Sequence, residues 1–436
     1  MSIIPTSHSS LSTWLSYLEH LHRQEIDLGL DRIKQVAARL PIELDSIKIV
    51  VGGTNGKGST CAMLESIYLA AGYRVGLYTS PHLIRFNERI RLNGLEASDQ
   101  QIVEQLAIIE EARGDISLSY FEYTTLAAIL LFKANDIQVS IFEVGLGGRL
   151  DAVNIIDADC SIITSIAIDH INYLGDTREQ IAWEKAHIYR QGKVAICADP
   201  EPPQSLIDYA QEIGADLQLF GRDFNYTGDQ IQWTYIGKNQ RRHALAYPAL
   251  RGANQLINAA AALTAVEALK MSAPVPNQSI REGLLRVELA GRFQILPGQP
   301  TTVLDVAHNP HAAAVLQHNL HAMSYFPYTT AVFGMLDDKD VSQVIKCLEK
   351  TVDYWYCASL SGTRGVSGQA LADKINSLIS KDKDGLPEVR VFDSPHQAYE
   401  AAKARSNPED RIVVFGSFLT VADAVSYTHL RAHETL

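Results

Sequence analysis

The chain has 436 residues, of which 46% are hydrophobic and 20% are charged, and its formal net charge is −12. This length is sufficient for two domains, and the acidic balance argues against nucleic acid or another polyanion as a partner. The five cysteines form no C-x-x-C pair and are interpreted as reduced, and neither a secretory leader nor a run of about 18 apolar residues is visible. We therefore predict a cytoplasmic enzyme that acts on small molecules and has no membrane or nucleic-acid partner. We also expect a monomer.

Short apolar runs alternate with longer periodic segments along the first half of the chain. The runs, which we predict to be strands, comprise residues 47–51, 75–78, 139–144, 161–166 and 194–196. Segments with the periodicity of helices lie between or after them, at residues 100–112, 123–132 and 178–190. Runs that are apolar at successive positions suit strands buried on both faces, so the pattern predicts a doubly wound, mostly parallel sheet covered by helices.

A glycine-rich turn follows the first of these strands. Its sequence is Gly53-Thr54-Asn55-Gly56-Lys57-Gly58-Ser59, and a helix is predicted directly after it. Small residues let backbone N–H groups face phosphate oxygens, the helix N-terminus attracts an anion, and Lys57 adds a full charge. The turn therefore predicts an ATP or GTP site, although Val51 replaces the first glycine of the common pattern and Gly58 separates Lys57 from Ser59. The alternative, a glycine turn with a solvated lysine, fits this order of strand, turn and helix less well.

Other predicted strand ends also carry polar side chains. Ser80, Glu143 and His170 each come at or just after such an end, and Lys185 lies on the helix after His170. A doubly wound sheet gathers these ends at one edge, where carboxylate oxygen is a hard ligand for Mg²⁺, and Lys185 can join a metal only if neutralised or converted to a carbamate. Arg149, in the glycine-rich turn after Glu143, is a candidate for stabilising phosphoryl charge, with a surface ion pair as the alternative. Taken singly, such residues are more often caps, structural histidines or solvated lysines.

The middle of the chain has a different pattern. Residues 221–247 become polar and aromatic around the turn sequence NYTGD, which predicts an antiparallel hairpin appended to the sheet. Residues 254–270 follow as an alanine-rich helix. This helix carries Asn258, which taken alone is a packed or capping residue.

A domain boundary is predicted where the sequence LPGQP precedes a new series of strands. We place one domain at residues 1–296 and a smaller one at residues 297–425, and we interpret residues 426–436 as an atypical tail. Strands of the second domain are predicted at residues 302–306, 330–333, 353–357, 389–392 and 412–415. A site shared by two such sheets is expected in the cleft between their strand ends.

Three residues near this boundary are candidates for closing such a cleft. Arg292 lies just before it, and Asp305 and His308 follow the first strand of the second domain within the sequence DVAHNP. An arginine and an Asp/His pair can bracket a nucleotide, although each residue is weak support when taken alone.

Together these motifs resemble the folylpolyglutamate synthase family, and in particular its bacterial bifunctional dihydrofolate synthase/folylpolyglutamate synthase branch, related to the Mur ligases. The resemblance extends to about residue 425 and rests on IDLGLDR (26–32), GTNGKGS (53–59), TSPH (79–82), FE (121–122), EVGLGGRLD (143–151), SIAIDH (165–170), EK (184–185), GRF (291–293) and DVAHNP (305–310). The tail is the one departure, because the family usually continues with a final helix that we expect to be truncated here.

The resemblance implies a fold and a reaction. The fold is a P-loop domain with a doubly wound, mostly parallel sheet, followed by a smaller Rossmann-like α/β domain. The reaction is ATP-dependent: a pterin-linked carboxylate attacks the γ-phosphate of ATP, and the amino group of L-glutamate then displaces the resulting acyl phosphate, with two Mg²⁺ ions. Dihydropteroate as acceptor gives dihydrofolate, and reduced folates give folylpolyglutamates.

By matching position, the resemblance also implies roles for single residues. The phosphates of ATP would be cradled by Thr54, Asn55, Gly56, Lys57, Gly58 and Ser59, and ATP would further contact Asn258, Arg292 and Asp305. The ligands of Mg²⁺ would be Ser80, Glu143 and His170. Catalysis would further involve Lys57, Lys185 as a carbamylated lysine bridging toward the second metal, and His308 as the residue that orients the intermediate or glutamate. Dihydropteroate would lie against Ser119, Tyr120, Phe121, Glu122, Leu150, Asp151 and Ala152, where aromatic rings can pack beside a pterin.

Several alternatives stay open. Two of them are ligases: a folylpolyglutamate synthase without the dihydropteroate activity, and a Mur-type ligase that acts on a nucleotide-linked peptide. A third is a nucleotide-gated binding module without catalysis, which only Gly58 and the incomplete tail favour. ADP release that requires both glutamate and a pteroate acceptor would exclude this third alternative.

Overall fold

The computed structural model describes residues 4–22, 27–229, 231–380, 385 and 387–425, so the predicted tail lies outside the described residues. The chain forms two compact units, one of Met1–Ala249 and Leu256–Val287, the other of Leu250–Gln255 and Glu288–Leu436. The division therefore falls before the predicted boundary at residue 296. The reason is β12 (Gln294–Leu296), which pairs with β13 (Thr301–Leu304) in the sheet of the second unit.

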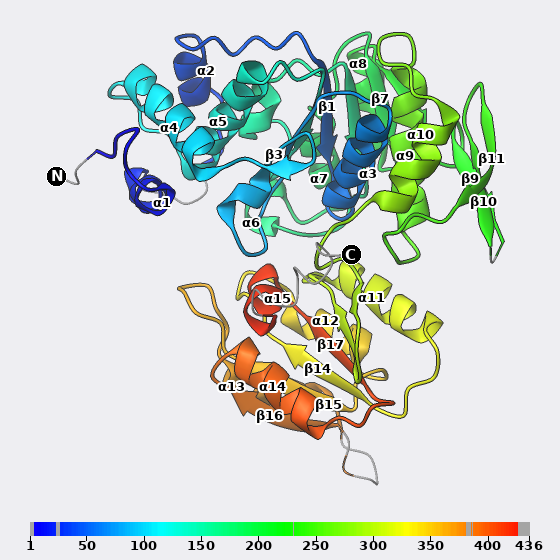
Figure 1. Ribbon diagram of the computed structural model, residues 1–436. Coiled ribbons are helices and arrows are strands. Elements are labelled where there is room, and N and C mark those ends of the chain that lie inside the picture. Colours follow the sequence, from blue (N-terminus) through cyan, green and yellow to red (C-terminus); the bar gives the residue numbers. More distant parts are fainter. Residues whose placement is uncertain (1–3, 23–26, 230, 381–384, 386, 426–436) are drawn as a thin grey trace. The chain divides into compact units, whose positions relative to one another are not determined.

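The first unit is built on an eight-stranded sheet with the spatial order β4-β3-β2-β5-β1-β6-β7-β8 (Figure 1). Neighbours from β2 to β8 pair in parallel, and β3 and β4 extend one edge in antiparallel fashion. The strands are β1 (Ile47–Gly52), β2 (Val75–Tyr78), β3 (Ile90–Leu92), β4 (Leu95–Glu96), β5 (Val139–Glu143), β6 (Cys160–Ile163), β7 (Val194–Cys197) and β8 (Asp216–Leu219). The five predicted strands are present and parallel, which confirms the predicted sheet. The pattern misses β3, β4 and β8 because they are short or only partly buried.

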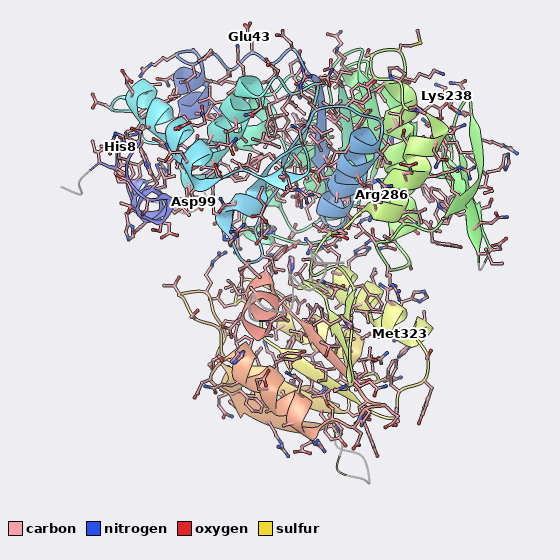
Figure 2. The ribbon with its side chains drawn as sticks, viewed as in Figure 1. His8, Glu43, Asp99, Lys238, Arg286 and Met323 are labelled. Atoms are coloured by element: carbon pink, nitrogen blue, oxygen red, sulfur yellow. The ribbon has the colours of Figure 1, made fainter. Side chains whose placement is uncertain are left out.

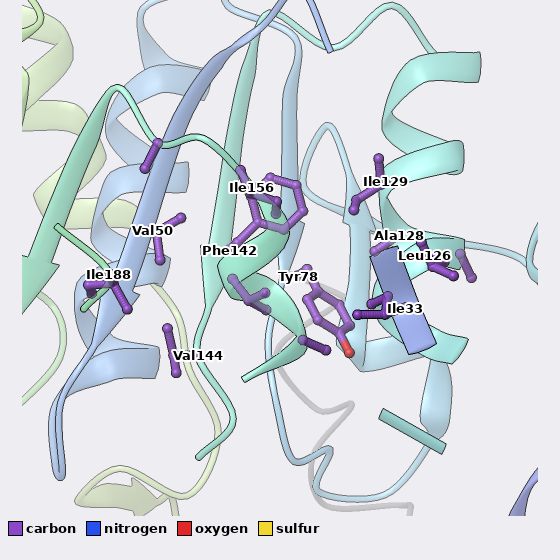
Figure 3. Packing of buried hydrophobic residues seen from close by; sticks show 14 of the residues in the cluster. Ile33, Val50, Tyr78, Leu126, Ala128, Ile129, Phe142, Val144, Ile156 and Ile188 are labelled. Carbon is purple, nitrogen blue, oxygen red and sulfur yellow. The ribbon is translucent and has the colours of Figure 1, made fainter. Parts of the chain in front are cut away.

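Successive side chains of the central strands are buried on opposite faces of this sheet. Val50, Tyr78 and Phe142 belong to one core cluster, together with residues of the helices that cover their face (Figure 3). Val51 and Leu77 are also buried but lie outside that cluster, on the opposite face. Burial on both faces explains why these strands are continuous apolar runs in the sequence.

Helices cover the sheet. Those of the first unit are α1 (Leu11–Leu21), α2 (Asp31–Ala37), α3 (Lys57–Ala70), α4 (Asp99–Arg113), α5 (Tyr120–Ala134), α6 (Ile171–Leu174), α7 (Arg178–Ala186), α8 (Gln204–Glu212), α9 (Gln255–Ala268) and α10 (Asn277–Arg286), with 3₁₀ turns η1 (Phe86–Arg89) and η2 (Ala152–Ile155). Several begin at side chains suited to capping, such as Ser98 before α4 and Thr177 before α7. Helix α3 contacts β1, β2 and β5, and α10 packs next to α3 (Figure 1).

A small antiparallel sheet precedes α9. It consists of β9 (Asn225–Gly228), β10 (Gln232–Ile236) and β11 (Arg241–Ala246), in the order β11-β10-β9. The predicted antiparallel hairpin is present as β9 and β10, but a third strand, β11, pairs with β10, and the three strands form a sheet of their own instead of joining the large one. The Tyr235 hydroxyl lies 3.0 Å from Thr264 Oγ1 and donates to Glu267 Oε2 at 3.1 Å, which ties this sheet to α9.

The second unit contains a six-stranded sheet with the order β12-β13-β17-β14-β15-β16. Its strands from β13 onward pair in parallel, and β12 is antiparallel to β13. The remaining elements are β14 (Thr329–Phe333), β15 (Tyr354–Ala358), β16 (Glu388–Phe392), β17 (Arg411–Phe415), α11 (Pro310–Ala322), α12 (Val341–Leu348), α13 (Gly368–Leu378), α14 (Pro395–Arg405) and α15 (Phe418–Ala424). The rings of Phe333, Trp355 and Phe415 contact one another in its core. This confirms a smaller α/β domain, with β12 as an unpredicted additional strand.

The surface is rich in charged side chains. Asp99, Lys238 and Arg286, for example, are exposed on the first unit (Figure 2). Within the described part of the chain, no helix has both the length and the hydropathy needed to span a bilayer.

The contact between α10 and α3 leads to a stability prediction at Gly283. A Cβ at this position would lie 2.5 Å from Ile67 Cα and 2.7 Å from Ile67 N. Alanine in a helix is favoured over glycine by about 1 kcal/mol, but overpacking against backbone atoms costs about 1–3 kcal/mol and outweighs that gain. We expect Gly283→Ala to lower the free energy of unfolding in urea by about 1 kcal/mol, whereas Gln278→Ala, at an exposed position of the same helix, does not lower it. Unchanged stability of Gly283→Ala would contradict the close packing of the two helices.

Candidate active site

The phosphate loop, residues 53–59, connects β1 to α3. Gly53 has φ +139° and Gly56 has φ +91°, values that favour glycine. A Cβ on Gly53 would collide with Thr164 Oγ1, and a Cβ on Gly56 would lie 2.6 Å from Asn258 Oδ1. Both positions therefore require glycine, and the turn lies directly against Asn258 of α9. Because a glycine at the N-cap has no side chain, the first N–H groups of α3 can donate to a bound anion.

Lys57, the first residue of α3, lies close to a buried carboxylate. Its Nζ donates to Gly53 O at 3.2 Å and lies 4.0 Å from Glu143 Oε1. Glu143 is the last residue of β5 and is 5% exposed, and the Ser80 N–H donates to its Oε2 at 3.3 Å. The structure thus brings Lys57, Ser80 and Glu143 together at the carboxyl ends of β1, β2 and β5.

The loop after β6, residues 164–170, is bonded to the phosphate loop. The Thr54 N–H donates to Ser165 O at 2.7 Å, and the Asn55 N–H donates to Ser165 Oγ at 3.0 Å. The Thr54 hydroxyl donates to Ala167 O at 3.2 Å and accepts from the Ala167 N–H at 3.1 Å. Thr54 and Asn55 therefore serve to hold the phosphate loop in shape.

His170 ends the loop after β6, with φ +52° at the start of α6. Its N–H donates to Asp169 Oδ1 at 2.8 Å, and its Nε2 lies 4.0 Å from the same oxygen. Since β5 and β6 are parallel strands on either side of β1, His170 lies at the same edge of the sheet as Glu143.

The donor atoms at this edge fit a hard cation held jointly with a substrate. Across the described residues, no group of three or more His, Cys, Asp or Glu side chains is arranged to hold a metal ion. Mg²⁺ commonly takes only one or two protein carboxylates and completes its shell with waters and substrate phosphates. The buried Glu143 carboxylate, with Ser80 beside it and the phosphate loop next to both, meets that description.

Lys185 of α7 is buried beneath the phosphate loop. Its Nζ donates to Gly53 O at 3.0 Å. Burial lowers the pKa of Lys185 to about 7, with a further lowering by the charge of Lys57 and opposing effects of Asp169 and Asp151. A large fraction of this amine is therefore unprotonated at neutral pH, which makes it nucleophilic.

The turn after β5 packs against α7 next to Lys185. A Cβ on Gly148 would lie 2.7 Å from Glu184 O, and the Arg149 N–H donates to that oxygen at 2.9 Å. The Arg149 guanidinium pairs with Glu184 Oε1 at 2.9 Å and lies 5.0 Å from the ring centroid of Trp183. These contacts agree with the ion-pair alternative for Arg149 rather than with a phosphoryl contact.

The predicted pterin surface begins at α5. Ser119 and Glu122 form a capping box, in which the Ser119 N–H donates to Glu122 Oε2 at 2.7 Å and the Glu122 N–H donates to Ser119 Oγ at 3.3 Å. Arg32 Nε donates to the same Glu122 oxygen at 3.3 Å. Among the described residues, Glu122 Oε1 is buried without a hydrogen-bond partner.

Aromatic side chains lie between the two capping residues. The Tyr120 ring is 6.1 Å from the Phe86 ring and 5.5 Å from the guanidinium of Arg89. The Phe121 ring is 5.8 Å from the Tyr78 ring, and a Cβ on Gly145 would lie 2.7 Å from Phe121 Cζ. Phe121 therefore lies against the glycine-rich turn after β5.

The other predicted pterin segment, residues 150–152, leads into η2. The Asp151 carboxylate accepts the N–H groups of Leu146 and Val153, each at 2.9 Å, and Leu150 O accepts the Gly29 N–H at 3.2 Å. Burial raises the pKa of Asp151 to about 6, against the lowering effect of its backbone hydrogen bonds. Ala152 is buried as the first residue of η2. Hydrogen bonds to backbone N–H groups of neighbouring residues thus fix the position of this segment.

The second unit contains the remaining predicted site residues. Asp305, after β13, accepts the Phe293 N–H at 2.9 Å and the Ala307 N–H at 2.8 Å, and burial raises its pKa to about 6. The Arg292 guanidinium lies 4.9 Å from the Phe418 ring centroid, and the His308 ring lies 6.3 Å from it. The Phe418 ring thus lies near both Arg292 and His308. In the sequence, only its position after a predicted strand indicates that Phe418 belongs near the site.

Comparison with known proteins agrees with this geometry. The Mur ligase middle domain family matches residues 51–266, and the Mur ligase, glutamate ligase domain family matches residues 291–418. The dihydrofolate synthase/folylpolyglutamate synthase of Escherichia coli K12 is 45% identical over 429 residues, covering 98% of this chain and 97% of its own. The protein of the same name from Haemophilus influenzae is 41% identical, covering 95% of this chain and 97% of its own. The chain belongs to the dihydrofolate synthase/folylpolyglutamate synthase family.

Solved structures of family members extend the likeness to the whole fold. E. coli FolC in complex with DHPP and ADP has a TM-score of 0.91 and 45% identity, covering 98% of this chain and 100% of its own. The Yersinia pestis folylpolyglutamate synthase/dihydrofolate synthase complexed with AMPPNP and Mn ion has a TM-score of 0.88 and 44% identity, covering both chains completely. The predicted family and fold are therefore confirmed, and this chain is an ATP-dependent ligase of the Mur type.

Sequence reasoning about this family site misses the residues that hold the phosphate loop in place. Thr164, Ser165 and Ala167 contact it directly, and none carries a group that marks catalysis. Their only signal is their place after a predicted strand, within or beside the sequence SIAIDH.

The buried amine of Lys185 gives a testable dependence of stability on pH. Because its pKa falls from 10.5 to about 7, the unfolded chain binds more protons than the folded chain between these values. The cost of burying this lysine is therefore complete below pH 7 and disappears as the pH rises toward 10.5. In buffers freed of carbon dioxide, we expect Lys185→Met to unfold at a higher temperature than wild type. The difference in unfolding temperature should become smaller as the pH rises from 7 to 10.5. A difference in unfolding temperature that does not change with pH would show that Lys185 titrates normally in the folded protein.

Proposed function

We propose that this protein joins L-glutamate to dihydropteroate, giving dihydrofolate, and to reduced folates, giving folylpolyglutamates, through an acyl phosphate. The observation that carries the proposal is the convergence of the phosphate loop, Lys57, Glu143 and Ser80 at one edge of a parallel sheet. The E. coli and H. influenzae relatives, each named dihydrofolate synthase/folylpolyglutamate synthase, match nearly the whole chain.

The chemistry explains why such a site is needed. An oxygen of the acceptor carboxylate attacks the γ-phosphorus of ATP, the bond to the β–γ bridging oxygen breaks, and ADP leaves. The amino nitrogen of glutamate then attacks the acyl carbon, forming the amide while inorganic phosphate departs and the amine loses its protons. Carboxylate and triphosphate repel each other, so the protein must supply positive potential where they meet. The N-terminus of α3 and Lys57 provide it.

We assign Ser80, Glu143 and His170 as the residues that would hold Mg²⁺. The ion would neutralise phosphate charge and polarise the γ-phosphoryl group. The phosphate-loop residues Thr54 to Ser59 would bind the phosphates, and Asn258, Arg292 and Asp305 would bind other parts of ATP. His308 would orient the intermediate or the incoming glutamate.

We further propose that Lys185 is carbamylated. Its neutral amine adds to carbon dioxide, forming an N–C bond and releasing one proton, so the side chain becomes an anion. The lowered pKa and the burial of Lys185 favour this reaction over that of any exposed lysine. The negative group would then balance Lys57 and attract a second cation.

For the pterin we propose the surface formed by residues 119–122 and 150–152. Tyr120 and Phe121 offer aromatic rings, and Glu122 Oε1 offers a buried acceptor without a partner in the described part of the chain. Ser119 and Leu150 would help to shape this surface through their backbone hydrogen bonds, Asp151 through its carboxylate and Ala152 through its burial.

We also propose that the protein is a cytoplasmic monomer. The five cysteines are unpaired in the structure, which agrees with a reducing compartment.

The reaction is tested with dihydropteroate carrying oxygen-18 in its carboxylate, L-glutamate and MgATP. We expect dihydrofolate, ADP and inorganic phosphate in equal amounts, with one oxygen-18 transferred to phosphate for each amide formed. Mass spectrometry of products and phosphate measures both. Activity with reduced folates alone would identify a folylpolyglutamate synthase without the dihydropteroate activity, and label-free phosphate would exclude the acyl phosphate.

Carbamylation is tested by carbon-13 NMR in buffer containing labelled bicarbonate, above the Lys185 pKa of about 7. Wild type and the control Lys193→Met, which alters an exposed lysine paired with Asp159, are expected to share a carbamate resonance that Lys185→Met lacks. A carbamate signal that persists in Lys185→Met would rule out this assignment.

A further inference from the structure

The loop after β6 alternates its backbone bonding between two neighbours. Ser165 and Ala167 bond to Thr54 and Asn55 of the phosphate loop, as described above. Ile166, between them, has both backbone groups bonded on the other side. Its N–H donates to Asp199 Oδ2 at 2.6 Å, and its carbonyl accepts from Arg178 Nε at 2.9 Å.

Arg178 and Asp199 also bind each other. Arg178 Nη2 donates to Asp199 Oδ1 at 3.0 Å and to Glu201 O at 2.9 Å, and Asp199 Oδ1 accepts the Glu201 N–H at 2.9 Å. The Asp199 side chain is 7% exposed and that of Arg178 is 38% exposed. Two charged side chains therefore hydrogen-bond to the backbone of one loop residue, Ile166. Such charge-assisted hydrogen bonds are stronger than neutral ones.

The position of the pair connects three parts of the site. Asp199 follows β7, Arg178 is the first residue of α7, and α7 also carries Lys185. Ile166, to which both side chains bond, lies four residues before His170 and between the two residues that bond to the phosphate loop. Because bonding alternates from one residue to the next, a shift of the loop by one residue would turn Ile166 toward the phosphate loop and its neighbours toward Arg178 and Asp199. Both sets of hydrogen bonds would then be lost.

We propose that Arg178 and Asp199 are positioning residues, which fix the register of residues 165–170 and thereby the shape of the phosphate loop and the place of His170. This inference rests on the proposed function, because it gives the pair a role in binding ATP. Neither side chain contacts the phosphate loop itself in the bonds described, so both act through the backbone of Ile166.

A purely structural pair would behave differently from a positioning pair. If the pair only stabilises the fold, its loss lowers the unfolding temperature and leaves nucleotide affinity unchanged in the protein that stays folded. If it positions the loop, nucleotide affinity and turnover fall in the folded protein, because small displacements of binding groups cost much of their effect.

A matched control exists in the same unit. Arg113 is buried, pairs with Glu110, and donates to the carbonyls of Gly114 and Ile116 at 3.0 and 3.2 Å. It thus combines an ion pair with backbone contacts, as Arg178 does, but lies at the end of α4. Arg113→Ala therefore reports the effect of losing such a pair away from the phosphate loop.

The experiment compares Arg178→Ala, Asp199→Ala, Asp199→Asn and Arg113→Ala with wild type. Unfolding temperature is measured by calorimetry, the affinity for AMPPNP with Mg²⁺ by titration calorimetry, and hydrogen exchange of residues 164–170 by mass spectrometry. We expect both alanine variants of the pair to bind AMPPNP about tenfold more weakly and to exchange faster in this loop. Asp199→Asn keeps an acceptor for the Ile166 N–H and should retain more affinity than Asp199→Ala. Arg113→Ala should lower the unfolding temperature but leave the AMPPNP affinity and the hydrogen exchange of residues 164–170 unchanged.

The outcomes separate this inference from the proposed function. Unchanged AMPPNP affinity and loop exchange in both alanine variants would overturn the positioning role, whatever the reaction of the wild type. If an alanine variant does not fold, Asp199→Asn decides the question by the same two measurements. Weakened AMPPNP binding in a protein that makes no dihydrofolate would support the positioning role and reject the proposed acceptor.

Discussion

Two lysine side chains converge on one backbone oxygen, and the rest of the site is arranged around this contact. Lys57 of α3 and Lys185 of α7 donate to Gly53 O at 3.2 and 3.0 Å. Burial lowers the pKa of Lys185, and the nearby positive charge of Lys57 lowers it further, so the amine of Lys185 loses its proton more easily. The two lysines that share this oxygen therefore differ chemically: Lys57 lies near the carboxylate of Glu143, whereas Lys185 is a buried amine with a lowered pKa.

The convergence depends on how closely the loops approach one another. Gly53 has no space for a Cβ because Thr164 occupies it, and Gly148 has none because the backbone of α7 occupies it. These two glycines let the loops after β1 and β5 lie directly on their neighbours, which brings Lys185 within reach of the phosphate loop. With a net charge of −12, the chain offers no general attraction for ATP or folates, so the positive potential has to be built locally in this way.

The fold of both units was largely predictable because parallel strands buried on two faces leave continuous apolar runs. The strand predicted at residues 75–78 matches β2, and Glu143 lies at the strand end where it is expected. The short strand β12 escapes prediction because its three residues gain their strand character from pairing with β13. Contacts such as Asn55 with Ser165 escape it as well, since they join residues 110 positions apart through groups common to most loops. Arg149 shows the converse limit: its residue type suits phosphoryl transfer, but only the fold reveals its pairing with Glu184.

The surface that we propose for the pterin contains residues that also have a structural role. Ser119 and Glu122 form a capping box through Ser119 Oγ and Glu122 Oε2, and this box sets the direction of the first turn of α5, which carries Tyr120 and Phe121. Because Phe121 lies against Gly145, the placement of its ring is tied to the same turn after β5 that holds α7 and Lys185. A change in the cap would therefore displace the aromatic rings and, through the glycine-rich turn after β5, would alter the contacts with α7. One short turn thus links the aromatic ring of Phe121 with α7, the helix that carries Lys185.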